Sequence, residues 1–305
     1  MCRKPLPSIL IPSLLLSVAA GTSRAQDPLP SLSPETRRTY EARLGEARRA
    51  WERAPENADS IIWLGRRTAY LGGYRDAIAI YTEGIRLHPQ DARMYRHRGH
   101  RYVTIREFDR AIADFERGFE LVRGRPDEVE PDGIPNARGV PTSTLHSNLR
   151  YHLGLAHYLK GDFARAAAVF GDDVRAAREA DNPDMLVASS HWLYMALRRD
   201  GKEEAAAGVL VPITRDLPVI ENGSYHRLLL LYRGELSPDS LLRPGDLSSV
   251  EDVTVGYGVG NWHLYNGRAE AARAIFRRIV AAPQWSAFGF VAAEAELRRG
   301  SSGGR

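Results

Sequence analysis

Residues 74–81 read YRDAIAIY, and the same arrangement returns 34 residues later, where residues 108–115 read FDRAIADF. It occurs twice more, as FARAAAVF at residues 163–170 and as AEAARAIF at residues 269–276. In every copy a small residue is followed four positions later by an aromatic residue. Glycines keep the same spacing, since Gly65 and Gly99 lie 34 residues apart. A fixed period of this length is typical of stacked structural units.

Each unit reads as two helices joined by a tight turn. Apolar residues between 61 and 71 recur at helical spacing, and Gly72 and Gly73 end this first helix. Residues 74–87 form a second amphipathic segment, which Pro89 prevents from continuing. Two antiparallel helices approach closely only where side chains are small. We therefore expect Gly65 to meet Ala77 at the contact, with Tyr74 and Tyr81 filling the space around it.

These motifs resemble the tetratricopeptide repeat (TPR), whose unit carries Leu-Gly, then alanine, an aromatic, a small residue and proline at fixed offsets. The first three units carry the resemblance, through Leu64, Gly65, Ala77, Tyr81, Gly84 and Pro89, then Gly99, Ala111, Phe115 and Gly118, then Leu153, Gly154, Ala166 and Phe170. The second unit departs from the pattern, because Arg98 stands where the family prefers leucine. The resemblance implies an all-α fold, a TPR-like solenoid of α-hairpins in a right-handed superhelix with a C-terminal capping helix.

The pattern divides the chain into a series of segments. Repeats 1 and 2 are followed by a proline-rich insertion, which we expect to be an irregular loop that is either functional or mobile. After repeat 3 the pattern weakens, recovers in repeat 6, and ends in a capping helix over residues 285–299. The expected segments are 1–25 (signal peptide), 26–57 (one helix), 58–123 (repeats 1–2), 124–146 (insertion), 147–180 (repeat 3), 181–216 (divergent repeat 4), 217–249 (degenerate repeat 5), 250–299 (repeat 6 and cap) and 300–305 (disordered tail).

The first 25 residues have the layout of a secretory signal peptide. Arg3 and Lys4 precede an apolar stretch, and small residues before Gln26 fit a cleavage site. The apolar stretch of about 15 residues is short for a membrane span, which needs roughly 20. We therefore predict an exported protein, periplasmic or secreted, with no stable membrane span after cleavage. Cleavage would remove the single cysteine, Cys2, and with it any disulfide.

Charge and motifs argue against several classes of function. Loss of Arg3, Lys4 and Arg24 lowers the formal net charge from +4 to +1, a small excess for a nucleic-acid partner. No nucleotide-binding or hydrolase motif occurs in a suitable context. His97 and His100 have a spacing compatible with zinc but no further ligand nearby in the sequence, so we expect inner-wall residues and no metal. We expect no cofactor and no enzymatic activity.

The resemblance places the first helix of each unit on the concave side of the solenoid. Carried onto this sequence, a peptide-binding groove would contain Arg66, Tyr70, Arg93, Arg96, His97, His100, Asn148, Tyr151, His152, Tyr158 and His191. Arginine can bind a carboxylate through two hydrogen bonds, and tyrosine offers flat area with a polar tip. A peptide with an acidic residue or a free C-terminus would suit this wall. The Lys/Asn carboxylate clamp of some relatives is not matched, because no lysine lies at these positions.

Two functions remain in contention. The first is an exported adaptor that binds a peptide or protein segment in a groove that stays open, a non-enzymatic protein-protein interaction module. The alternative is a structural scaffold in a cell-envelope assembly that contacts its partners through outer surfaces. The sequence leaves the oligomeric state open.

Overall fold

The computed structural model describes residues 27–302, except residues 132, 137, 243–244 and 246. The predicted signal peptide, residues 1–25, and residues 303–305 of the predicted tail lie outside the described part. Within it the secondary structure is helical, and the only strand-like pairing is an isolated bridge between Val129 and Thr144. The prediction of an all-α fold is confirmed. No helix in the described ranges is long and apolar enough to span a bilayer.

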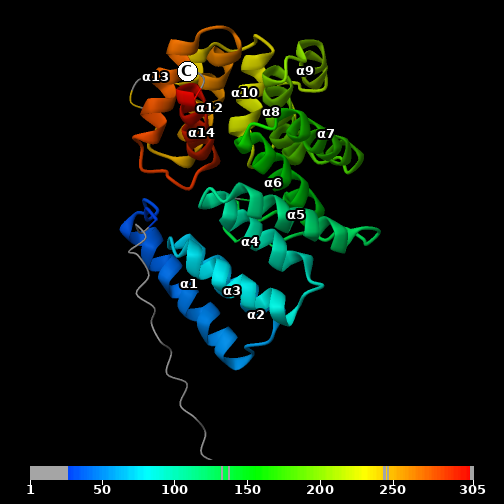
Figure 1. Ribbon diagram of the computed structural model, residues 1–305, viewed down its shortest axis with the longest axis vertical. Helices are drawn as coiled ribbons and strands as arrows, with labels where there is room; N and C mark the ends of the chain where they lie inside the picture. The colour runs from blue at the N-terminus through cyan, green and yellow to red at the C-terminus, as the bar shows by residue number, and fades with distance from the viewer. Residues whose placement is uncertain (1–26, 132, 137, 243–244, 246, 303–305) are drawn as a thin grey trace, which may run out of the picture.

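The helices follow one another as hairpins along the chain (Figure 1). Their bounds are α1 (Pro34–Arg53), α2 (Ala58–Tyr70), α3 (Tyr74–Leu87), α4 (Ala92–Thr104), α5 (Phe108–Val122), α6 (Leu145–Lys160), α7 (Phe163–Glu179), α8 (Pro183–Arg199), α9 (Glu203–Leu210), α10 (Gly223–Tyr232), α11 (Pro238–Leu241), α12 (Val250–Tyr265), α13 (Ala269–Val280) and α14 (Phe288–Ser302).

The hairpins stack into two layers. The first helices α2, α4, α6, α8, α10 and α12 contact one another in that order, and we call this layer the first-helix wall. The second helices α3, α5, α7, α9 and α13 each pack against the first helix of their own hairpin. This arrangement confirms the TPR-like α-hairpin solenoid.

In four of the hairpins a glycine of the first helix packs against the aromatic residue of the repeated motif. A Cβ atom on Gly65 would lie 2.5 Å from the ring of Tyr81, and one on Gly260 would lie 2.5 Å from the ring of Phe276. Gly99 with Phe115 and Gly154 with Phe170 repeat the contact at 2.7 and 2.9 Å. Real Cβ atoms do not come this close to a neighbour, so each glycine allows its aromatic partner to lie flat against the first helix.

Arg98, which departs from the TPR pattern, forms a two-pronged contact across its hairpin. Its Nε and Nη2 donate to the two carboxylate oxygens of Asp114, at 2.8 and 2.7 Å. Asp114 is buried on α5, and burial raises its pKa while the Arg98 hydrogen bond lowers it. An ion pair therefore replaces the leucine contact that the family pattern leads one to expect.

The C-terminal helix α14 folds back onto the first-helix wall, where it packs against α12 and α6 (Figure 1). The segment before it reaches the first repeat, since the Trp285 ring lies 5.8 Å from that of Tyr74 and 3.8 Å from the Arg106 guanidinium. Helix α14 begins at Phe288 and continues to Ser302. The prediction of a disordered tail is therefore wrong for residues 300–302, which are helical.

Candidate functional site

The proline-rich insertion between α5 and α6, residues 123–144, has its two ends side by side, paired in antiparallel by backbone hydrogen bonds. The Glu130 amide donates to the Ser143 carbonyl at 3.1 Å, and the Leu145 amide donates to the Glu128 carbonyl at 2.8 Å. The Asp127 carboxylate fixes the base of the turn, because it accepts from the His146 amide at 3.0 Å. These bonds direct the following residues of the insertion onto the wall made by α2, α4 and the start of α6.

Glu130 is the centre of the contact between insertion and wall. Its side chain is only 9% exposed, and its Oε2 accepts a hydrogen bond from Asn148 Nδ2 at 3.0 Å. Arg96 Nε lies 2.9 Å from the same oxygen without pointing its N–H at it, so this contact is an ion pair. Arg66 Nη1 and His97 Nε2 lie 4.0 and 3.8 Å from Oε1. The wall therefore surrounds one carboxylate with positive and polar groups.

The wall also contacts the main chain that follows Glu130. Arg66 Nη1 donates to the Pro131 carbonyl, and Arg67 Nη1 donates to the Gly133 carbonyl, both at 2.8 Å. A Cβ atom on Gly133 would lie 1.7 Å from the Tyr70 hydroxyl, so only glycine fits there. The insertion is thus held through the Glu130 side chain and through the carbonyls of Pro131 and Gly133. The expectation of an open groove is wrong for this half of the wall, because the chain's own insertion covers it.

The far end of the insertion is tied to α8 and to the segment before α10. Asn136 Nδ2 donates to Glu221 Oε2 at 3.0 Å, and the Thr142 hydroxyl donates to the other oxygen of the same carboxylate. Asn182 Nδ2 donates to the Thr142 carbonyl at 2.8 Å. The Asp184 carboxylate accepts the Glu221 amide at 2.9 Å and so fixes the position of Glu221. The insertion is therefore anchored on two repeats.

Large apolar side chains of the insertion do not enter the core. Val129, Ile134 and Val140 are 64%, 57% and 47% exposed. Their burial therefore contributes little, and the insertion is held to the wall mainly by hydrogen bonds and ion pairs.

Further along the first-helix wall, α14 covers α6, while α12, a helix of the wall itself, packs against α8. The ring of Phe288 lies 5.4 Å from that of His100 and 5.6 Å from that of His152. Tyr158 is fully buried, and its hydroxyl accepts from Tyr257 at 2.8 Å and from Asn261 Nδ2 at 2.9 Å. These groups form the interior of the protein in this structure.

The structure thus separates the predicted groove residues into three groups. Arg66, Arg96, His97 and Asn148 gather around Glu130, with Tyr70 beside Gly133. The second group lies under α14 or in the aromatic core; it comprises His100, Tyr151, His152, Tyr158 and His191. Arg93 points elsewhere, since it pairs with Asp59 at 2.7 Å and Asp91 at 2.6 Å.

The histidines of the wall carry no positive charge near neutral pH. Burial and neighbouring arginines hold the pKa of His97 and of His100 well below the usual range. Arg96 Nη1 lies 3.2 Å from His97 Nδ1 and 3.5 Å from His100 Nδ1. Arginine can only donate, so both Nδ1 atoms accept and both rings are neutral. The positive charge of the wall therefore comes from its arginines.

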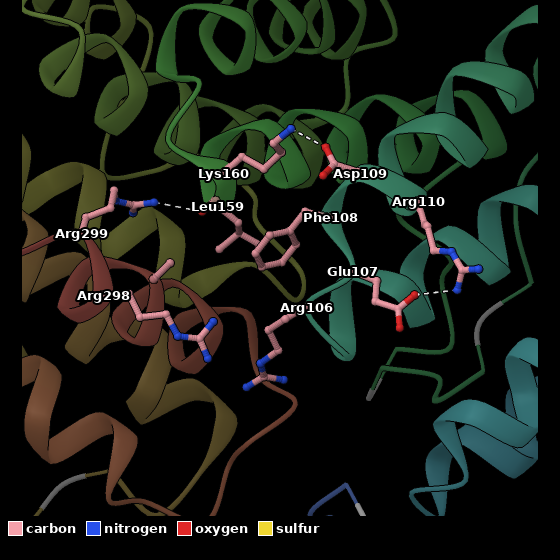
Figure 2. Close-up of a pocket in the computed structure, with 10 residues that line it drawn as sticks. Arg106, Glu107, Phe108, Asp109, Arg110, Leu159, Lys160, Arg298 and Arg299 are labelled. Atoms are coloured by element: carbon pink, nitrogen blue, oxygen red, sulfur yellow. Dashed lines mark hydrogen bonds and ion pairs between the residues drawn. The ribbon is translucent and has the colours of Figure 1, made fainter. Parts of the chain in front are cut away.

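A second basic region lies between α5, the end of α6 and α14, where a pocket of about 520 Å³ opens (Figure 2). Its cations already have acidic partners. Lys160 pairs with Asp109, Arg110 pairs with Glu107 at 2.7 Å, and Figure 2 shows these pairs across the pocket. Arg106 and Arg298 both pair with Glu294 at 2.8 Å. We interpret this region as the seam that joins α14 to the middle repeats.

Sequence reasoning missed Glu130 as the occupant of the wall, although one signal was present. The insertion carries the acidic residues Asp127, Glu128 and Glu130, and the wall opposite it is rich in arginine. Complementary charge in one chain favours such a contact. No group of three His, Cys, Asp or Glu side chains in the described ranges is arranged to hold a metal ion.

Comparison with known proteins gives matches in structure only. No protein-family model matches the sequence, and no curated protein is similar to it in sequence. Solved structures that are similar in fold include YrrB, BtubC and the Naa15/Naa10 complex. YrrB, described as a TPR protein with an unusual peptide-binding site, has 16% identity over 82% of this chain and 97% of its own, with a TM-score of 0.42.

BtubC from P. vanneervenii has 14% identity over 88% of this chain and 91% of its own, with a TM-score of 0.46. The Naa15/Naa10 complex bound to HypK-THB has 14% identity over 80% of this chain and 34% of that chain, with a TM-score of 0.38. At these values we transfer no ligand or partner to this chain.

Proposed function

We propose that this protein is a non-enzymatic interaction module that binds an acidic segment of a partner protein. The binding surface is the arginine wall, which we define as Arg66, Arg67, Arg96 and Asn148 on α2, α4 and α6. In the unbound protein the insertion occupies this wall as an internal ligand, and a partner segment has to displace it. We also propose that the mature protein acts in the periplasm or outside the cell, on the basis of its first 25 residues.

The single observation that carries this proposal is how Glu130 and its neighbours are held. The carboxylate lies against Arg96 and Asn148, while arginines bind two carbonyls of the residues that follow. Backbone contacts of this kind accept any extended segment, and the carboxylate contact selects for an acidic one. The wall therefore has the chemistry of a receptor for an acidic peptide.

Because the insertion is held by polar contacts, its displacement costs little free energy. A typical protein hydrogen bond contributes only about 0.5–1.5 kcal/mol net, because water replaces it when it breaks. The insertion exposes its valines and its isoleucine, so little apolar burial opposes its release. An acidic segment of a partner can therefore compete for the same arginines.

A labelled peptide with the sequence of residues 125–135 tests the proposal against the full-length protein. In the wild type the tethered insertion competes at an effective concentration in the millimolar range, so the peptide should bind weakly. Glu130→Gln in the protein weakens this competitor, and we expect peptide binding to tighten at least about tenfold, as measured by fluorescence anisotropy. Adding Arg96→Met to Glu130→Gln should abolish the gain.

A peptide with glutamine at position 130 is the matched control and should bind worse than the acidic peptide to every variant. Equal binding of the peptide to the wild type and to Glu130→Gln would contradict the proposal.

That outcome would favour the alternative, a structural scaffold. The contacts of Glu221 with Asn136 and Thr142 support this second function, because they fix the insertion to a distant repeat as a brace. Partners would then contact outer surfaces of the solenoid.

A further inference from the structure

A small cavity lies between α2, α3 and α4, next to the Glu130 contact. It has a volume of about 100 Å³, and its lining includes Arg66, Arg96, Arg101, His97, His100 and Tyr70. Three of these side chains are guanidinium groups. The three positive groups around this small cavity repel one another. The cavity is therefore unlike a packing defect, whose lining is apolar.

Among the residues that the structure describes, Glu130 is the one carboxylate paired with these arginines. Glu130 lies beside Arg96 and Arg66 and leaves Arg101 without an acidic partner. Arg101 donates no side-chain hydrogen bond and forms no ion pair with any residue that the structure describes. The groups that act most strongly on its charge are Tyr81, Tyr70, Tyr74 and Arg96. Arg101 is therefore a guanidinium in a tyrosine-rich pocket with no countercharge.

Arg101 keeps its charge despite this environment. Burial lowers its pKa, but an arginine side chain stays protonated throughout the physiological range. The two histidines of the lining are neutral and contribute no negative charge. Arg96 Nε forms an ion pair with Glu130 but donates no hydrogen bond to it. Arg101 is only partly shielded from water, and an anion bound in the cavity would compensate its charge.

The pocket of Figure 2 is a comparison for this excess of positive over negative side chains around the cavity. Its cations lie in the same arginine-rich chain, and yet Lys160, Arg110, Arg106 and Arg298 each have an acidic side chain beside them. The cavity between α2, α3 and α4 therefore differs from that pocket, because one of its guanidinium groups has no acidic partner.

We infer that this cavity is a binding site for a small inorganic oxyanion, phosphate or sulfate, held by Arg101, Arg96 and Arg66. Guanidinium groups bind oxyanions through charge-assisted hydrogen bonds in a fixed geometry. The cavity has about the volume of three water molecules in the liquid, which admits one such ion and excludes nucleotides and sugar phosphates. The site goes beyond the proposed function, because it does not require the insertion to leave the wall.

Isothermal titration of the full-length protein with sodium phosphate tests this site directly. We expect saturable binding of one ion per chain at pH 7, whereas sodium chloride at the same ionic strength produces none. The melting temperature should rise by several degrees at saturation, because the ion binds the folded state. Absence of saturable phosphate and sulfate binding to the wild type would overturn the inference.

Arg101→Met separates the site from a general effect of salt. The variant should lose phosphate binding, while the exposed Arg86→Met retains it as the matched control. In buffer without phosphate or sulfate, Arg101→Met should be at least as stable as the wild type, because it removes a partly buried charge that has no acidic partner. Retained phosphate binding by Arg101→Met would contradict the assignment.

Glu130→Gln provides a second variant that does not alter the arginines. It removes the carboxylate that competes with the ion for Arg66 and Arg96, so phosphate should bind more tightly. Unchanged or weaker phosphate binding would contradict the site. Since this readout is ion binding and the readout of the proposed function is peptide binding, failure of one is distinguishable from failure of the other.

Discussion

The two halves of the first-helix wall are covered in opposite ways by the same chain. In the N-terminal half, α2 and α4 are covered by an insertion that contributes a carboxylate and backbone carbonyls and leaves its apolar side chains exposed. In the C-terminal half, α14 covers α6 and α12 packs against α8. These helices place the rings of Phe288 and Tyr257 against those of Tyr151, Tyr158 and Trp192. One half is closed by polar contacts and the other by a hydrophobic core.

The difference suggests that only the N-terminal half can open. Apolar burial contributes about 25 cal/mol for each Å² removed from water, and a buried helix removes a large area. Polar contacts with the insertion are exchanged for contacts with water or with a partner, so their loss costs less. The same repeat therefore supports a permanent core at one end and a replaceable contact at the other.

The largest predicted effect compares one substitution in each half. Trp192→Ala removes a buried ring that packs on Tyr158 and Tyr257, and should lower the free energy of unfolding by about 3–5 kcal/mol. Glu130→Gln should lower it by less than about 2 kcal/mol, because the insertion can leave and the arginines then meet water. Urea denaturation monitored by circular dichroism measures both. Similar losses for the two variants would show that the insertion is part of the core.

A second prediction tests whether the repeats themselves are equivalent in both halves. Gly65→Ala and Gly260→Ala each place a Cβ atom against an aromatic ring, and each should cost about 1–3 kcal/mol. Gly171→Ala is the matched control, since no atom lies within 4 Å of its added Cβ. That variant should be stabilised by up to about 1 kcal/mol, because alanine favours the helix. Loss of stability in only one half would mean that the two halves differ in their repeats as well as in what covers them.

The smallest predicted effect is the loss of folding stability at low pH that comes from His191. Burial lowers the pKa of His191 to about 3, below the value of about 6.5 that it regains on unfolding. Below pH 6.5 the unfolded chain therefore binds a proton that the folded chain does not, and stability falls as pH falls. Between pH 6.5 and 5.5 this histidine should cost about 1 kcal/mol, which His191→Gln should remove. Urea midpoints at both pH values measure the difference, and an unchanged pH dependence in the variant would contradict it.

Much of the fold follows from local sequence. Gly65, Ala77 and Tyr81 lie within one hairpin, so their spacing alone predicts a close approach of the two helices at Gly65. The atoms nearest to Gly65 belong to Tyr81, however, and not to Ala77 as predicted. The sequence shows that Arg98 departs from the TPR pattern. Its partner Asp114 could be identified only once the two helices were placed together. Contacts within a hairpin are thus readable from the sequence, because short separation limits the possible geometry.

Only part of the candidate site could be predicted from the sequence, for a physical reason. Arg66, Arg96, His97 and Asn148 were correctly grouped on one wall, since helix positions repeat from unit to unit. What covers them depends on the path of the insertion and on how far the solenoid turns, and neither follows from a 34-residue period. For this reason Tyr158 and His191 were predicted to line a groove, although they are fully buried beneath other helices. The sequence did not indicate Arg101 as a site residue, because the cavity that it lines forms only on folding.

The most direct test of a replaceable insertion is native-state hydrogen exchange, resolved by residue. The Glu130 amide, bonded to Ser143, reports on the insertion, and the Val291 amide, bonded to Ala287, reports on α14. We predict that Glu130 exchanges through a local opening with a free energy several kcal/mol below that of global unfolding, while Val291 exchanges only when the whole protein unfolds. Equal opening free energies for the two amides would contradict the account, because the insertion would then be as permanent as the core.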